Sequence, residues 1–324
     1  MLAVIDTTVW HYVAFIGAVL LFVVLDLFVF HRKTHAITFN NALMWTTITV
    51  VLALMFWGWI WWKYGKIPGN EFIAGYVIEL SLSMDNVFVI ALIFGYFRVP
   101  NAYQHRVLFF GFIDALIMRG IMIAIGVAIV TRFHWVLYGL GAFLIFSGLK
   151  MLFSQEEGVH PERNPVIKLA QRLFPVASQY DGARFFTRLN GRFALTPLAI
   201  VLLMVETTDL IFAIDSIPAI FVVTQDPYII FTSNIFAILG LRSLYFVLVG
   251  MIEYFRYLKY GLALVLVFVG VKMFIEIWHI QISTGTSLRI VLGILVVSIV
   301  ASLIAARFDP HPHPPEEPEP PEKP

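Results

Sequence analysis

Nine runs of apolar residues, each about 20 residues long, constrain the fold of this chain more than any other feature. A helix of about 20 apolar residues crosses the ~30 Å hydrocarbon core of a bilayer, whereas a soluble helix needs a polar face, which most of these runs lack. Hydrophobic residues make up 60% of the chain and charged residues only 13%, unlike in soluble domains. The sequence therefore predicts an all-α, polytopic membrane helix bundle, with about nine spans near 9–30, 42–62, 71–97, 106–131, 135–153, 195–222, 228–251, 259–279 and 286–306.

Lysine and arginine predict the orientation, because they concentrate in the cytoplasmic loops of membrane proteins. Arg32 and Lys33 follow the first run, Arg98 lies in the third connection, and the long fifth connection is also basic. The even-numbered connections carry few basic residues. This alternation predicts an N-terminus outside the cell and a C-terminus in the cytoplasm. The first run lacks a basic segment before it and exceeds a signal-peptide core, so we expect it to be retained.

The composition also limits the partners and divides the chain into units. The absence of cysteine excludes disulfides and thiolate-held metals, and the net charge of +1 does not indicate nucleic acid. The lipid bilayer and a small ion are the partners expected, and the oligomeric state is not indicated. The predicted units are an N-terminal two-helix unit at 1–66, a three-helix repeat at 67–154, a cytoplasmic loop at 155–194, a second repeat at 195–282, a C-terminal helix at 283–308 and a disordered Pro/Glu/His tail at 309–324.

An internal repeat is the most informative pattern in the sequence. The segment Gly148-Leu-Lys-Met recurs 122 positions later as Gly270-Val-Lys-Met. Asp85-Asn can be laid on Asp215-Ser at an offset of 130, although a register that places Asp85 on Asp209 also fits locally. The charge pattern has the third span running inward and the sixth running outward. The two three-helix units are therefore predicted to be inverted copies, which is a common plan of secondary transporters.

Charged residues inside the predicted spans point to a functional site. Each ionised group at the centre of an isolated membrane helix costs about 2.5–3.5 kcal/mol, so such groups face one another, water or an ion. The two arginines, one in each repeat, are the expected countercharges, and two arginines cannot neutralise seven acids. Asp26 and Asp114 are expected to support the site or relay protons. The full set is Asp26, Glu79, Asp85, Asp114, Arg119, Glu206, Asp209, Asp215 and Arg242.

Broken helices are expected to bring these acids together. Glu79 and Asp85 lie about 120° apart around an ideal helix, so they converge only if the helix unwinds between them. Pro218 lacks an N–H, and Ser83 and Ser216 can hydrogen-bond backbone groups that a break would release. Such a site would offer only oxygen ligands, which suit Mg²⁺, Ca²⁺ and Mn²⁺. Buried ion pairs that only hold helices together are the structural alternative.

The sequence indicates no chemical role for two lysines within the repeats. Lys150 and Lys272 occupy matched positions near the ends of their runs. A long lysine side chain at that depth can extend to the membrane interface. We therefore expect both ammonium groups to lie at the interface.

The motifs around these acids resemble those of the TerC/Alx family of bacterial membrane proteins. They read Glu79-Leu-Ser-Leu-Ser-Met-Asp85-Asn86 and Glu206-Thr-Thr-Asp209-Leu-Ile-Phe-Ala-Ile-Asp215-Ser-Ile-Pro. The resemblance covers roughly residues 10–305, and Thr207 is a departure from the Alx pattern. It implies a manganese exporter of the bacterial inner membrane, in a family whose name reflects tellurium resistance. Carried over to this chain, the candidate metal-binding residues are Glu79, Asp85, Asn86, Glu206, Asp209 and Asp215.

Together these features predict a transporter, not an enzyme, that exports Mn²⁺ by alternating access through an acidic midplane site. The cation is the substrate, and no tightly bound cofactor is expected. Exchange in which H⁺ competes for the same carboxylates is the second mechanism. Three alternatives remain: a membrane factor for insertion, assembly or metalation of exported proteins, an oxyanion pathway lined by the arginines, and an intramembrane protease using Asp85 and Asp215.

Overall fold

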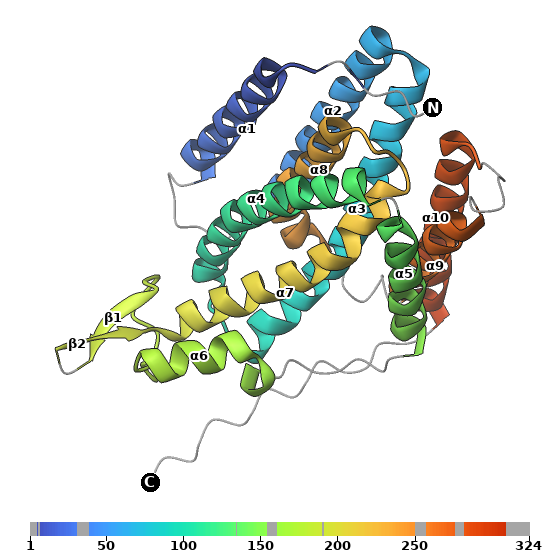
Figure 1. Ribbon diagram of the computed structural model, residues 1–324. Helices are drawn as coiled ribbons and strands as arrows, with labels where there is room; N and C mark the ends of the chain where they lie inside the picture. The colour runs from blue at the N-terminus through green and yellow to red at the C-terminus, as the bar shows by residue number, and fades with distance from the viewer. Residues whose placement is uncertain are drawn as a thin grey trace.

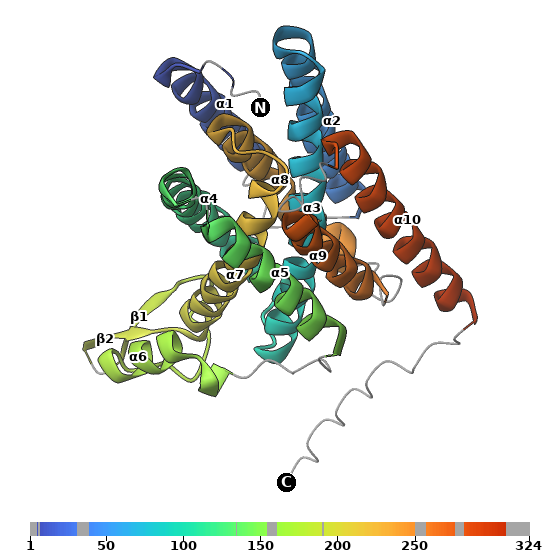
Figure 2. The same cartoon turned by 45° about the vertical axis from the view of Figure 1, so that its right-hand side comes forward.

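The computed structural model describes residues 5, 7–30, 39–133, 135–153, 161–189, 191–249, 257–275 and 282–308. In that part of the chain the fold is nearly all helical (Figures 1 and 2). The helices are α1 (Val9–Phe30), α2 (Phe39–Tyr64), α3 (Lys66–Tyr96), α4 (Asn101–Arg132), α5 (Val136–Phe153), η1 (Pro161–Arg163), α6 (Pro165–Leu173), α7 (Pro197–Phe221), α8 (Pro227–Val249), α9 (Leu258–Ile275) and α10 (Thr284–Phe308), and the strands are β1 (Phe186–Leu189) and β2 (Arg192–Leu195).

Eight helices of the described chain are long and apolar enough to cross a membrane, namely α2, α3, α4, α5, α7, α8, α9 and α10. They match eight of the predicted runs to within a few residues at most ends. The apolar stretch Val9–Leu25 of α1 is shorter than these eight. The first of the nine predicted spans therefore stays a prediction. The side chain of Asp26 and the tail 309–324 lie outside the described residues.

Helices α3 and α8 form the centre of the bundle, and α1, α2 and α10 lie at its periphery (Figure 2). In its most apolar window 72% of α8 is buried, whereas only 17% of the corresponding window of α2 is buried. The outer helices present large apolar side chains such as Val13, Met55 and Val297 to the surroundings. Such surfaces are stable in lipid and costly in water, so the periphery contacts the bilayer.

Helices α5 and α9 approach each other more closely than side chains allow. A Cβ atom on Gly148 would lie 2.7 Å from the carbonyl oxygen of Ala263, and one on Gly270 would lie 2.7 Å from that of Gly141. Along α5 from Gly141 to Gly148, the facing residue on α9 moves back from Gly270 to Ala263. The two helices therefore run antiparallel here, and small residues make the close backbone contact possible.

The described part of the connection between α5 and α7, residues 161–189 and 191–196, contains η1, α6 and the β1–β2 hairpin and forms a cap on the bundle. Asn164 caps α6 through its side chain, which accepts from the amides of Val166 and Ile167. Ile167 is buried in a cluster with Leu195, at the end of β2, and with Ala199 and Ile200 in the first turn of α7. Figure 1 shows α6 beside the antiparallel β1–β2 hairpin at this end of the bundle. The hairpin departs from the all-α prediction, and the end of β2 is anchored by the buried residues Ala194 and Leu195.

This cap is tied to the end of α3 as well. The hydroxyl of Tyr180 donates a 2.8 Å hydrogen bond to the carbonyl of Phe97. Burial raises the pKa of Tyr180, because a phenolate there would lose its hydration. The segment thus covers the ends of α3 and α7.

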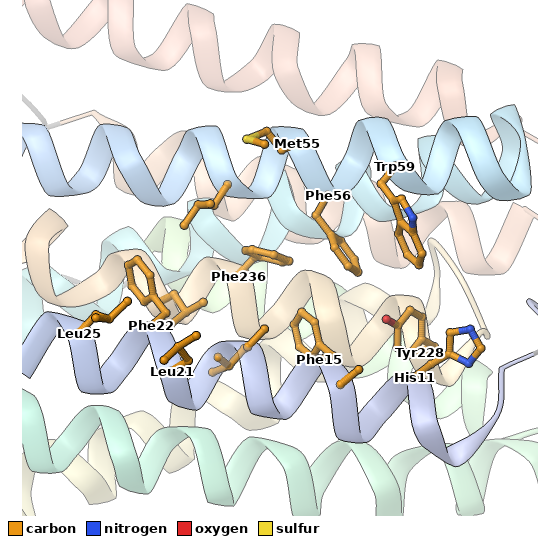
Figure 3. Close-up of a pocket in the computed structure, with 15 residues that line it drawn as sticks. His11, Phe15, Leu21, Phe22, Leu25, Met55, Phe56, Trp59, Tyr228 and Phe236 are labelled. Carbon is orange, nitrogen blue, oxygen red and sulfur yellow. The ribbon is translucent and has the colours of Figure 1, made fainter.

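A large apolar cavity of about 670 Å³ lies between α1, α2 and α8. Figure 3 shows His11 and Tyr228 at one end of it and Phe22 and Leu25 at the other. Its remaining described lining is apolar and aromatic, so it offers almost no ligand for a cation. The charged residues of the interior line a different cavity, which is described below.

The glycine contact between α5 and α9 generates a stability prediction. Gly148→Ala and Gly270→Ala should each lower the unfolding temperature in detergent micelles, because overpacking of this kind costs about 1–3 kcal/mol. Gly139→Ala is the matched control, since a Cβ at Gly139 would meet no atom within 4 Å. Thermal unfolding followed by intrinsic fluorescence measures the three variants. Equal unfolding temperatures would contradict the close approach.

Candidate functional site

Arg119, in the middle of α4, is the largest fully buried side chain of the described chain. Its guanidinium forms ion pairs with Glu79 of α3 and with Asp209 of α7, the latter at 3.1 Å. It also lies 3.4 Å from the hydroxyl oxygen of Ser216. A buried guanidinium is tolerated only with such partners, because its desolvation costs several kcal/mol. One arginine thereby links α3, α4 and α7.

A second contact joins α3 to α7 directly. The side-chain amide of Asn86 donates a 3.2 Å hydrogen bond to Asp209, which also accepts from Arg119. Asp209 thus receives hydrogen bonds from two helices. Its carboxylate is held at the crossing of α3, α4 and α7.

A cavity of about 250 Å³ opens beside this crossing. Asp215 projects into its wall and accepts a 2.9 Å hydrogen bond from Ser147 of α5. Lys150 attracts the same carboxylate electrostatically. Acids from both α3 and α7 therefore face one space, whose lining is Glu79, Leu82, Asp85, Asn86, Arg119, Ser147, Lys150, Met151, Phe212, Asp215, Ser216, Lys259 and Leu266.

Glu206 and Asp114 belong to a separate group. Neither residue lines the cavity, and their carboxylates interact electrostatically with each other. Asp114 also interacts with Asp209, so this group adjoins the crossing from another side. The six candidate ligands therefore divide into four that line the cavity, Asp209 at its edge, and Glu206 beside Asp114.

Arg242 occupies the position in α8 that matches Arg119, but its contacts differ. Its guanidinium bonds to His105 of α4 and lies 5.8 Å from the ring centre of Phe109. It is not among the lining residues of the cavity. Arg119 is thus paired with acids beside the cavity, whereas Arg242 is not one of the residues that line it.

The predicted helix breaks are wrong. Helices α3 and α7 are each continuous, and Ser83, Ser216 and Pro218 all lie inside them. Pro218 falls in the last turn of α7, and the helix continues to Phe221 although the proline leaves the carbonyl of Ile214 without its usual amide partner. Unwinding is unnecessary because the acids meet across helix crossings rather than along one helix.

The carboxylates do not surround a single point. In the part of the chain that the structure describes, no group of three or more His, Cys, Asp or Glu side chains could hold a metal ion. Glu79 and Asp209 are engaged with Arg119, and Asp215 with Ser147. This conformation therefore has acids along a cavity wall, and a divalent cation would need water or side-chain rearrangement to complete its coordination.

The sequence did not identify several residues of the charged interior. Lys150 lines the cavity instead of reaching only to the interface. Lys272 is buried and donates a 3.3 Å hydrogen bond to the carbonyl of Val222. The sequence did contain a signal for these two lysines, because both lie in the repeated Gly-x-Lys-Met segments. Ser147 gave no comparable signal.

The fold and the cavity define a polytopic helical membrane protein with a charged site in its interior. A model of the integral membrane protein TerC family matches residues 64–310, and the chain belongs to this family.

Several bacterial relatives align along most of the chain. An uncharacterized membrane protein of Myxococcus xanthus is 52% identical over 296 residues, covering 91% of this chain and 92% of its own length. A protein of Escherichia coli K12 named "Putative membrane-bound redox modulator Alx" is 45% identical over 278 residues, covering 83% of this chain and 86% of its own. No solved structure matches.

The ion pairs of Arg119 predict a strong coupling. Arg119→Met should destabilise the protein by about 3–5 kcal/mol, because it leaves buried carboxylates without a partner. Adding Glu79→Gln should recover part of that loss, and a double-mutant cycle in thermal unfolding measures the coupling. Arg184→Met is the control, since the pair of Arg184 with Asp181 is largely exposed. Additive effects of the two buried changes would contradict the pairing.

Proposed function

We propose that this protein exports divalent cations, Mn²⁺ foremost, across the bacterial inner membrane by alternating access. The observation that carries the proposal is the convergence of Glu79, Asp85 and Asp215 on one cavity inside the helix bundle. These acids come from two different helices, and each would be costly in lipid unless it served a purpose. Their oxygen atoms suit hard cations, and Met151 in the wall adds a thioether that favours Mn²⁺ over Ca²⁺.

The packing of α5 against α9 supports an inverted repeat. The atoms facing Gly148 belong to Ala263 and Val267, and those facing Gly270 belong to Gly141 and Ile145. Each residue of the first set lies 122 positions after its counterpart in the second, as does Gly270 after Gly148. A two-fold rotation that exchanges two antiparallel helices has its axis perpendicular to them. For helices that cross a membrane, this axis lies in the membrane plane, as it does between inverted repeats.

The hydrogen bonds at the crossing favour one register of the repeat. Asn86 contacts Asp209, and Ser216 shares the guanidinium of Arg119 with Glu79. An offset of 130 places Asn86 on Ser216 and Glu79 on Asp209. Exchange of the two repeats therefore converts the pair Asn86 and Asp209 into the pair Ser216 and Glu79. The register that places Asp85 on Asp215 is therefore preferred. Asp85 and Asp215 are then equivalent acids of the two units.

The lysines of the cavity fit a site that binds and releases cations. Lys150 and Lys259 line the same space as Asp85 and Asp215. An ammonium group near the carboxylates balances their charge when the cation has left and competes with it when it returns. Both lysines belong to helix ends predicted to be cytoplasmic, so the cavity reaches toward the side from which an exporter loads its substrate.

The other functions fit the site less well. An oxyanion would meet the carboxylates of Glu79, Asp85 and Asp215 in the cavity wall. The relatives named Alx carry a redox description, but this chain contains no cysteine with which to perform thiol chemistry. A redox effect here would be indirect, through the supply of a metal to other proteins.

The test is cation transport by the purified protein in proteoliposomes. Asp85→Asn and Asp215→Asn should each reduce Mn²⁺ transport at least about tenfold, because each replaces a negatively charged oxygen ligand of the cation with a neutral amide. Asp181→Asn is the matched control, since Asp181 lies in the cap and forms a partly exposed pair with Arg184. Transport at the wild-type rate in both cavity variants would refute the site. Absence of transport in the wild-type protein would favour the membrane-factor function.

A further inference from the structure

A second buried polar cluster lies at the other end of α3. Glu71 is completely buried, and one of its carboxylate oxygens accepts a 2.8 Å hydrogen bond from the hydroxyl of Thr224. Its other oxygen, Oε1, has no hydrogen-bond partner among the described residues. A buried carboxylate that is half satisfied is costly, and such a group calls for a reason beyond packing.

The neighbours of Glu71 cap helix ends, whereas Glu71 only holds Thr224, whose hydroxyl oxygen accepts from the amide of Asp226 at 3.1 Å. Asp226 caps α8 by accepting hydrogen bonds from the amides of Tyr228 and Ile229, at 2.8 and 3.1 Å. Lys272 holds the carbonyl of Val222 just beyond the end of α7. Glu71 caps no helix end, since it lies inside the first two turns of α3 and uses only its side chain. Removal of its charge would leave these caps intact.

Two charged groups act on Glu71 electrostatically, namely Asp226 from the turn before α8 and Lys272 from α9. Both are almost completely buried. An acid and a lysine, both buried, therefore lie within electrostatic reach of Glu71. The cluster therefore contains opposing charges that allow the proton occupancy of Glu71 to change.

The position of Glu71 places it beyond the central cavity. It precedes Glu79 by eight residues on one continuous helix, a rise of about 12 Å. Between them, Gly75 is packed so closely that an added Cβ would lie 3.0 Å from Ser233 and 3.1 Å from Ile220. The cavity extends away from this seal toward Lys150 and Lys259. In the predicted orientation, Glu71 lies on the extracytoplasmic side of the seal.

We propose that Glu71 is a proton-binding site, and that the proton it takes is the one exchanged for the exported cation. The inference rests on the proposed export function. Glu71 binds H⁺ from the extracytoplasmic side when that side opens, and its carboxylate becomes a neutral carboxyl group. After the cation has left outside, the protein returns with the proton, which leaves to the cytoplasmic side when the contact of Gly75 with Ser233 and Ile220 loosens. Thr224 holds the carboxyl group in place through both states.

The first test detects the proton directly, without transport. Infrared difference spectra of the protein in liposomes between pH 5 and pH 9 should contain a carboxylic acid band that is lost in Glu71→Gln and retained in Glu162→Gln. Glu162 is an exposed acid of the cap and serves as the control. Absence of a band that depends on Glu71 would overturn the proton site, whatever the protein transports.

The second test couples the proton to the cation. A tenfold gradient of H⁺ is imposed across the liposome membrane, with the higher H⁺ concentration on the extracytoplasmic side of the protein. The wild-type rate of Mn²⁺ transport toward that side should then rise several-fold. Glu71→Gln should lose this response, whereas Glu71→Asp should retain part of it. Thr224→Val keeps the shape of Thr224 and should shift the pH midpoint of transport upward, because the ionised carboxylate loses its hydrogen bond. A normal response to the gradient in Glu71→Gln would overturn the coupling role.

The outcomes separate the two proposals. If wild-type protein moves no cation but the infrared band is present, the export function fails while Glu71 still binds a proton. If wild-type protein moves Mn²⁺ and the Glu71 variants respond to the gradient as it does, the export function stands and the inference about Glu71 fails. The unfolding temperature of Glu71→Gln and Glu71→Asp checks that both variants are folded.

Discussion

The buried guanidinium of Arg119 is the interaction on which the rest of the interior depends. It brings a positive charge into the centre of a helix bundle, where only close carboxylates make such a charge tolerable. Glu79 and Asp209 supply them from two other helices, so the helices are held at one crossing. The same ion pairs set the direction of the neighbouring acids. Asp85 and Asp215 face the adjoining cavity rather than the lipid.

The two repeated units are similar in sequence and unequal in the use of their charges. Arg119 reaches acids at the crossing, and the contacts of Arg242 include His105 and the ring of Phe109. Glu206 lies within electrostatic range of another acid, Asp114, rather than lining the cavity. An exporter by alternating access must exist in two conformations, and unequal contacts in the two halves are what distinguishes one conformation from the other.

The central cavity and the Glu71 cluster divide the interior into two polar regions. Gly75, Ile220 and Ser233 close the space between them in this conformation. Each region contains both acids and a lysine, so each can balance its charge as ions arrive and leave. This arrangement suits a protein in which one region is accessible at a time. The apolar cavity between α1, α2 and α8 takes no part in it, because its lining has so few polar groups (Figure 3).

The sequence by itself determined the helical membrane fold, eight of the spans and the acids that line the central cavity, because lipid forces the backbone into helices and makes each buried charge conspicuous. It did not determine how those acids meet. The prediction of broken helices at Ser83, Ser216 and Pro218 was wrong, because convergence depends on the angle and rotation at which α3, α4 and α7 cross. The buried position of Lys272 and the importance of Glu71 were missed for the same reason. Near a helix end, the sequence cannot distinguish a side chain that reaches water from one enclosed by neighbouring helices, and only the tertiary packing decides between them.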